Sequence, residues 1–234
     1  SKPLATALQP ITRAINQIIS YGQSLSVGTA AGSAISTTQP FSNVTFNGGV
    51  KTASDFSAFK PLVEDIQNAP NGDASGETIC SGAANYASLL AYRDNGVTPS
   101  QFVTCASACG KGGSTSGGLI KSSAWYISKF LPHLNAAKNL NADTAIHAVL
   151  WAQGESDASA LQTYQTYYDR LNQLQIDTES DAKLKTGQTS PVFFITYSLS
   201  TRIAYTDAIA RAQFDLCKNN PKFVMATPTY FIPR

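Results

Sequence analysis

Short apolar runs alternate along the chain with longer segments of helical periodicity. The runs of strand length lie at residues 16–21, 101–106, 145–152, 191–198 and 223–230. Segments of helical spacing lie between them at residues 77–95, 122–140, from about Leu161 through Leu171 (with Tyr164 and Tyr168), and 204–218. This alternation predicts a three-layer α/β/α sandwich with a mostly parallel five-stranded sheet, right-handed crossovers and helices on both faces.

The remaining segments interrupt this pattern without dividing the chain. Residues 1–14 are expected to form a short amphipathic helix or an ordered arm that leads into the first strand. Residues 27–47 are rich in Gly, Ser, Thr and Asn, which predicts a long loop, and Phe46, Phe56 and Phe59 are expected to anchor it. No internal repeat or linker is visible, so residues 1–234 are expected to form one domain.

Composition excludes several classes of partner. The formal net charge is +2, and the Lys and Arg residues are scattered without a basic run. Nucleic acids and anionic membrane surfaces are therefore not expected partners. No apolar stretch approaches the roughly 20 residues of a membrane span, and no leader with a positively charged start opens the chain.

The four cysteines, Cys80, Cys105, Cys109 and Cys217, lack the paired Cys-x-x-Cys spacing and His partners of a zinc site. No metal or other cofactor is therefore expected. One or two disulfides in an oxidising compartment and four buried thiols both fit this pattern. We favour disulfides, with three full pairings open.

Three polar segments follow successive predicted strands. Gly22-Gln23-Ser24 comes after the first strand, a glycine-rich loop at residues 109–118 comes after the second, and Gln153-Gly154-Glu155 comes after the third. The glycine loop lacks the Walker spacing of a phosphate cradle, and by itself it could be a linker. Because parallel strands end at one edge of a sheet, the three segments are expected to converge there.

Acyl transfer needs a nucleophile and hydrogen-bond donors aimed at the oxyanion, and this set offers both. Ser24 supplies a hydroxyl, the glycine loop supplies backbone N–H groups, and Gln153 supplies a side-chain amide.

In these segments the sequence resembles the SGNH hydrolases, and within them the sialate O-acetylesterase-like branch that includes carbohydrate esterase family six. The matching stretches are Gly22-Gln23-Ser24-Leu25-Ser26, Gly112-Gly113-Ser114 and Trp151-Ala152-Gln153-Gly154-Glu155-Ser156-Asp157. The glycine match is the loosest, since Gly110, Gly112 and Gly113 compete for one role.

The resemblance implies roles for five residues. Ser24 would attack an ester carbonyl, and the oxyanion would be held by the N–H groups of Ser24 and Gly113 and by the amide of Gln153. Glu155 would orient Ser24 or contact a sugar hydroxyl, and Gln23 would orient the site or contact substrate. Asp157 is instead interpreted as a helix cap, because Asp is common at helix starts.

The family takes its base and its orienting acid from a D-x-x-H motif beyond the fifth strand, and that motif is missing up to Arg234. The chain has two histidines. His147 is expected to be a packed core residue within the third strand and His133 to lie on the surface of a helix, so neither matches the family's base.

Three explanations stay open. Either the base is carried by a second chain produced by cleavage after Arg234, or this is a shortened piece of a longer polypeptide that carries it, or the protein is a pseudoenzyme that binds glycans and has no base.

The expected function is therefore a secreted or surface- or virion-associated serine esterase that removes acetyl groups from a carbohydrate, with His and Asp supplied by sequence beyond Arg234. The alternatives are a non-catalytic glycan-binding or structural module and a lipid esterase or thioesterase of the same fold. The fold and the residues above imply acyl transfer; the sugar substrate is implied by the resemblance.

Overall fold

The structure is a computed structural model that describes residues 13–29, 31–65, 67–68, 74–200 and 206–228. Its main sheet has seven strands in the order β3-β2-β6-β1-β7-β8-β9. These are β1 (Ile15–Gly22), β2 (Val44–Phe46), β3 (Phe59–Pro61), β6 (Thr104–Ala108), β7 (Thr144–Ala152), β8 (Phe193–Ser198) and β9 (Phe223–Pro228), and a separate pair is formed by β4 (Gln67–Asn68) and β5 (Ala74–Ser75). All neighbours in the main sheet are parallel except β2 and β3. The predicted arm lies almost entirely outside the described residues.

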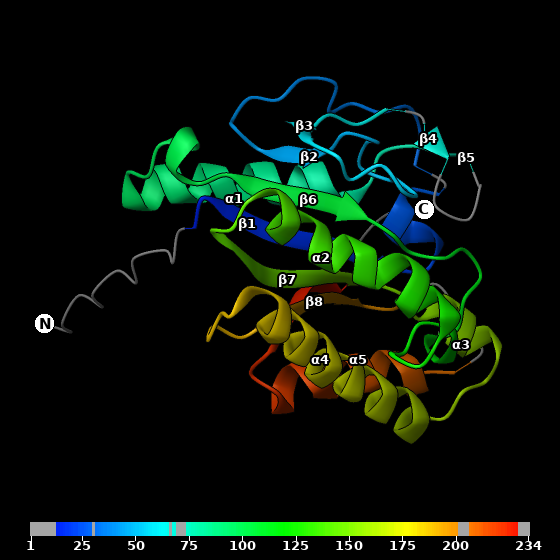
Figure 1. Cartoon of the computed structure of the whole chain (residues 1–234). Helices are drawn as coiled ribbons and strands as arrows, with labels where there is room; N and C mark the ends of the chain where they lie inside the picture. Colours follow the sequence, from blue (N-terminus) through cyan, green and yellow to red (C-terminus); the bar gives the residue numbers. More distant parts are fainter. Residues whose placement is uncertain (1–12, 30, 66, 69–73, 201–205, 229–234) are drawn as a thin grey trace, which may run out of the picture.

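The described part of the chain has five α-helices, and Figure 1 shows α1 on one side of the sheet with α2, α4 and α5 on the other. Their bounds are α1 (Ile79–Asn95), α2 (Leu131–Leu140), α3 (Glu155–Ser159), α4 (Tyr164–Thr186) and α5 (Ala208–Asn219), with a π-helical turn at Tyr126–Phe130 before α2. The ends of α1 follow from local chemistry, because the Thr78 side chain accepts the N–H of Cys80 and Gly96 ends the helix at φ 66°.

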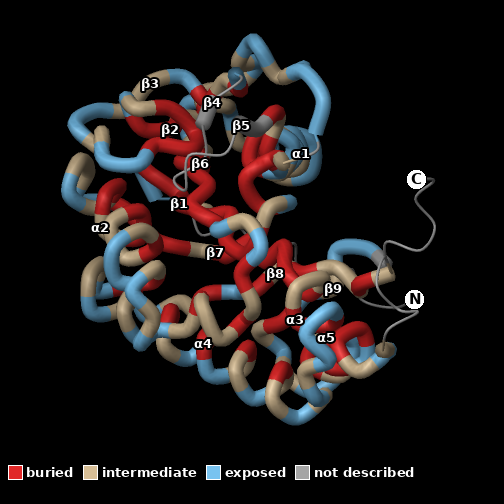
Figure 2. Tube along the Cα trace, turned by 90° about the vertical axis from the view of Figure 1, so that its right-hand side faces the viewer, coloured by how far each residue is buried: buried red, intermediate tan, exposed pale blue. Residues whose placement is uncertain are grey.

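The core follows the alternation of side chains along the central strands. In β1, Ile19 and Tyr21 pack with α2 and α4, whereas Ile18 on the opposite face packs with α1. Buried residues accordingly concentrate along the strands in Figure 2. The mostly parallel sheet with helices on both faces confirms the predicted α/β/α class.

The predicted number of five strands is wrong, because β2 lies inside the expected loop of residues 27–47 and β3 lies beyond it, where no strand was expected. Each has three residues, too few for an alternating pattern to be recognised. The expected anchoring of this segment is confirmed, since Phe46 is buried and Phe56 and Phe59 pack around it.

Further expectations were wrong in detail. The helical segment predicted from about Leu161 begins later, because Leu161 is 65% exposed and precedes α4, and within that helix Tyr167, rather than Tyr164 or Tyr168, is fully buried. The preference for disulfides was also wrong, because all four cysteines are free thiols and three of them are buried. Burial raises the pKa of the Cys80 thiol to about 12.

Neither a membrane-spanning helix nor a metal-binding cluster occurs among the described residues. None of the helices there is long and apolar enough to cross a bilayer. No group of three or more His, Cys, Asp or Glu side chains in that part of the chain could hold a metal ion.

His133, expected on the surface, is instead buried between α2 and the sheet. Its Nδ1 lies 2.8 Å from Ser107 Oγ and its Nε2 lies 3.0 Å from the carbonyl oxygen of Thr52. A carbonyl can only accept, so Nε2 carries the proton and Nδ1 accepts from the serine. Desolvation lowers the pKa of His133 from 6.5 to about 4.

This burial predicts a loss of stability in mild acid. Between pH 6.5 and 4 the unfolded chain binds a proton at His133 that the folded protein excludes. The free energy of unfolding therefore decreases as the pH is lowered, and at pH 4 this group reduces it by about 3 kcal/mol. Urea unfolding of the wild type and of His133→Gln across this range should show a shallower slope for the variant. Desolvation also lowers the pKa of His147, so His147→Gln shows how much of the slope comes from that second histidine. Equal slopes for wild type and His133→Gln would contradict the assignment.

Candidate active site

Ser24 stands at the end of β1 on a tightly held turn. Gly22 has φ +142°, and a Cβ atom there would lie 2.2 Å from the carbonyl oxygen of Ala152 on β7. The next N–H, that of Gln23, donates to the same carbonyl at 2.9 Å. Ser24 then begins a 3-10 turn, Ser24–Val27. Only glycine at position 22 allows β1 to approach β7 this closely, so the backbone determines where the Ser24 turn lies.

The hydroxyl of Ser24 is accessible while its neighbours are occupied. Ser20 Oγ donates to the carbonyl of Ser26 at 2.7 Å, and Ser26 Oγ donates to the carbonyl of Gln23 at 2.6 Å. Ser24 is half-buried, and its hydroxyl makes no hydrogen bond to any described residue. The turn is therefore fixed by other groups, and the Ser24 hydroxyl remains available for chemistry.

The glycine segment lies against this turn through Gly110. A Cβ atom on Gly110 would lie 1.8 Å from Ser26 Oγ and 2.8 Å from the carbonyl oxygen of Gly22, and Lys111 donates its N–H to that carbonyl at 2.9 Å. Gly113 is exposed and has φ +67°, and a Cβ atom added there would have no neighbouring atom within 4 Å. Its expected role as an oxyanion donor stays a prediction, and the close packing belongs to Gly110.

The third segment joins both of the others through side chains. Gln153 is fully buried, and its Nε2 donates to the carbonyl of Ser114 at 3.2 Å and to the carboxylate of Asp157. The backbone N–H of Ser156 donates to Gln23 Oε1 at 3.1 Å. The structure thus brings together the three predicted segments at one edge of the sheet.

Asp157 does not cap a helix, as the sequence suggested. No side chain caps the start of α3, and the fully buried Asp157 carboxylate instead accepts from Ser116 N at 2.6 Å and from Ser116 Oγ at 2.7 Å. Its partner is 41 residues away in the chain, which no local pattern could reveal.

Glu155 faces a groove beside the Ser24 turn. Its Oε1 accepts from the hydroxyl of Tyr197 at 2.8 Å, and its Oε2 is buried without a hydrogen-bond partner in the described part of the chain. Desolvation, with the Glu155 charge next, raises the pKa of Tyr197. The groove has a volume of about 600 Å³ and reaches Leu25 and Thr29 of the Ser24 loop.

The same face of the sheet continues as a second hollow of about 540 Å³ that shares Ile195 with the first. Its lining includes Ile18, Ala148 and Phe193, and Val224 beside them is 44% exposed. On this face α1 contacts β1 and β6, and the described residues leave β7, β8 and β9 open.

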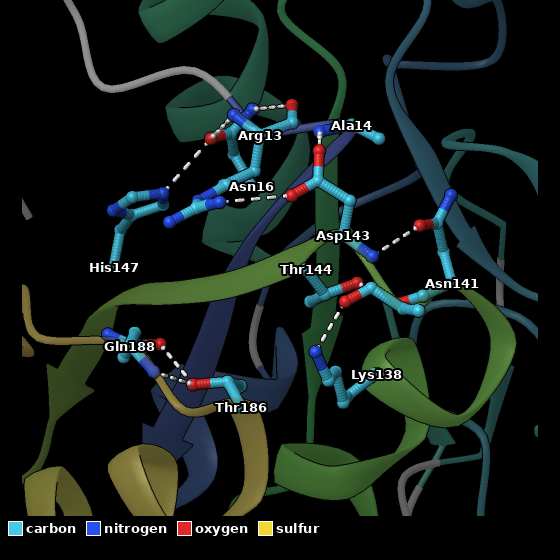
Figure 3. Close-up of polar contacts among 11 residues, drawn as sticks. Arg13, Ala14, Asn16, Lys138, Asn141, Asp143, Thr144, His147, Thr186 and Gln188 are labelled. Carbon is cyan, nitrogen blue, oxygen red and sulfur yellow. Dashed lines mark hydrogen bonds and ion pairs between the residues drawn. The ribbon is translucent and has the colours of Figure 1, made fainter.

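Neither histidine lies at this edge. His147 Nε2 is 3.0 Å from Asn16 Oδ1 near the start of β1, and Figure 3 shows both beside Arg13. Asn16 and Gly22 are separated by six residues of strand, or roughly 20 Å. With His133 held by Ser107 and Thr52, neither of the chain's two histidines contacts Ser24.

Comparison with known proteins identifies a family and a similar fold. Residues 21–229 match the family described as carbohydrate esterase, sialic acid-specific acetylesterase. The chain belongs to this family. The esterase also resembles a solved structure of the Arabidopsis thaliana protein AT4G34215, with a TM-score of 0.68 and 17% identity over 91% of this chain and 85% of that one. That likeness supports the fold. A search of curated proteins gave no match.

The packing of the glycine segment predicts that two glycine substitutions in this esterase destabilise it for different reasons. Gly110→Ala should cost about 1 to 3 kcal/mol of unfolding free energy and slow the reaction of Ser24, because its methyl group must displace Ser26 and the Gly22 backbone. The methyl group of Gly113→Ala would enter open space, so this substitution should lower the unfolding free energy by about 1 kcal/mol, because of the positive φ alone. Thermal unfolding measures the stability of the two variants, and fluorophosphonate labelling measures the reactivity of Ser24 in each. A Gly110→Ala protein as stable and reactive as wild type would show that the segment does not pack as described.

Proposed function

We propose that this esterase removes O-acetyl groups from carbohydrates through an acyl-enzyme intermediate on Ser24. The observation that carries the proposal is the Ser24 hydroxyl, which is unbonded within the described residues and sits where three polar segments meet. A fixed serine beside clustered donors is the arrangement that acyl transfer requires.

In the proposed reaction, Ser24 Oγ forms a bond to the acetyl carbon while its proton passes to a general base. The carbonyl electron pair moves onto oxygen, which the N–H groups of Ser24 and Gly113 and the amide of Gln153 would stabilise. The intermediate then expels the sugar oxygen, which takes the proton from the base. Water hydrolyses the acetylated serine and releases acetate. One such donor is worth about 2.7 to 4 kcal/mol in the transition state.

We propose further that the base and its orienting acid come from polypeptide beyond Arg234. Support comes from the positions of both histidines and from the open apolar face over β7, β8 and β9. An amphipathic segment lying in this groove would bury apolar surface and would reach the Ser24 loop at one end. Glu155 lines the same groove, and its buried Oε2, which has no hydrogen-bond partner in the described residues, would accept a hydrogen bond from that segment or from a sugar hydroxyl.

The nucleophile is tested by fluorophosphonate labelling of the full-length polypeptide followed by peptide mass spectrometry. Wild type should carry the label on Ser24, and Ser24→Ala should lose both labelling and hydrolysis of acetylated sugars. Ser33→Ala is the matched control, since Ser33 is exposed in the adjoining loop and should retain both. Binding of glycans by an unlabelled, inactive wild type would support the alternative of a non-catalytic module.

The groove is tested by placing a charge in it. Ile195→Asp in the full-length polypeptide should reduce acetylesterase activity at least about tenfold, because an aspartate at the shared point of the two hollows opposes burial of an apolar segment. Leu184→Asp is the control, because Leu184 is 88% exposed on α4. Hydrogen exchange should be faster along β8 in Ile195→Asp alone. Unchanged activity and exchange would mean that nothing docks there.

A further inference from the structure

We infer that Asp157 is a positioning residue that orients the Gln153 amide and the glycine segment for oxyanion stabilisation, an inference that rests on the proposed function. Asp157 is fully buried, and no ion pair to it is found in the described part of the chain. Its carboxylate accepts from Ser116 N, from Ser116 Oγ and from Gln153 Nε2. One side chain therefore holds two of the three segments.

The contacts determine which way the Gln153 amide faces. Both hydrogens of Nε2 are directed at oxygens, those of Asp157 and of the Ser114 carbonyl, while Oε1 is buried without a partner in the described residues. Reversing the amide would set Oε1 against two acceptors. Leaving Oε1 buried and unpaired costs about 1 to 3 kcal/mol. The observed orientation of the amide accepts this cost because it keeps both hydrogen bonds of Nε2.

The backbone of Gln153 is fixed separately. Its carbonyl accepts from the Tyr167 hydroxyl at 3.0 Å and from Gln213 Nε2 at 2.9 Å. Gln213 in turn accepts the N–H of Leu199 at 2.8 Å. With the main chain anchored, the direction of the side-chain amide depends on Asp157 and Ser114.

These two bonds have different roles in the inferred step. The bond to the Ser114 carbonyl is long at 3.2 Å, and its N–H is the one that would exchange this acceptor for the oxyanion while the hydrogen stays on Nε2. The bond to Asp157 would persist and hold the amide plane during this change of partner. A donor held in place before reaction stabilises developing charge without the cost of reorientation.

Asp157→Asn tests this role in the full-length esterase with p-nitrophenyl acetate as substrate. The new amide would turn a donor toward Ser116 N or Gln153 Nε2, so kcat should fall about 100-fold while KM changes less than about threefold. In a Gln153→Ala background, Asp157→Asn should cause little further loss of kcat, because its effect on catalysis is exerted through Gln153. Independent, multiplicative losses in the double variant would overturn the inference.

Ser116→Ala is the matched control, since it removes the hydroxyl bond to Asp157 and keeps the backbone bond. It should lower kcat clearly less than Asp157→Asn. A loss as large as that of Asp157→Asn would place the effect in the glycine segment and contradict the role assigned through Gln153.

A measurement on wild type keeps the inference testable should Asp157→Asn fail to fold. In side-chain ¹H–¹⁵N spectra, one Gln153 Nε2 proton should exchange slowly in the free protein, and a fluorophosphonate adduct should shift chiefly the other. Two rapidly exchanging protons would contradict the inference. A wild type with neither activity nor labelling would instead refute the proposed function, while the spectrum of the free protein would still test the amide's orientation.

Discussion

The contact between the N–H of Gln23 and the carbonyl of Ala152, 2.9 Å long, fixes the start of the candidate site. It continues the pairing of β1 with β7 for one residue past the sheet and depends on Gly22, where a side chain would collide with Ala152. Because β1 lies between β6 and β7, segments that follow all three strands meet at its carboxyl end. The location of Ser24 is thus a consequence of strand order.

Much of this framework could be predicted from the sequence. The five longest parallel strands are visible as apolar runs: β1, β6 and β7 are buried along most of their length, and β8 and β9 keep their apolar residues although one face of each is open in the described part of the chain. Ile209, Ala212 and Leu216 face inward in α5, as their spacing predicts. The three polar segments could be predicted to converge, because parallel strands end at one edge.

What could not be predicted involves partners distant in the chain. The bonds of Asp157 to Ser116 and of His133 to Thr52 join residues from separate elements, and neither residue differs locally from a capping or surface side chain. Strands β2 and β3 are too short to show a period. Free cysteines and paired cysteines have the same composition, so the sequence could not decide between them.

The polar edge and the open apolar face belong to one arrangement. Glu155 lies at their junction, bonded to Tyr197 on one side and facing the groove that runs to Ile195. The described residues provide a candidate nucleophile, candidate oxyanion donors and the hydrogen bonds of Asp157, whereas both histidines are engaged elsewhere. The account therefore assigns positioning and charge stabilisation to this part of the protein and proton transfer to a segment in the groove.

The most direct test of the central claim is a crystal structure of the full-length esterase with a phosphonate bound covalently to an active-site serine. The account predicts the adduct on Ser24, with its phosphoryl oxygen within hydrogen-bond distance of the Ser24 and Gly113 N–H groups and of Gln153 Nε2. A phosphoryl oxygen directed into solvent, away from Gly113 and Gln153, would contradict it.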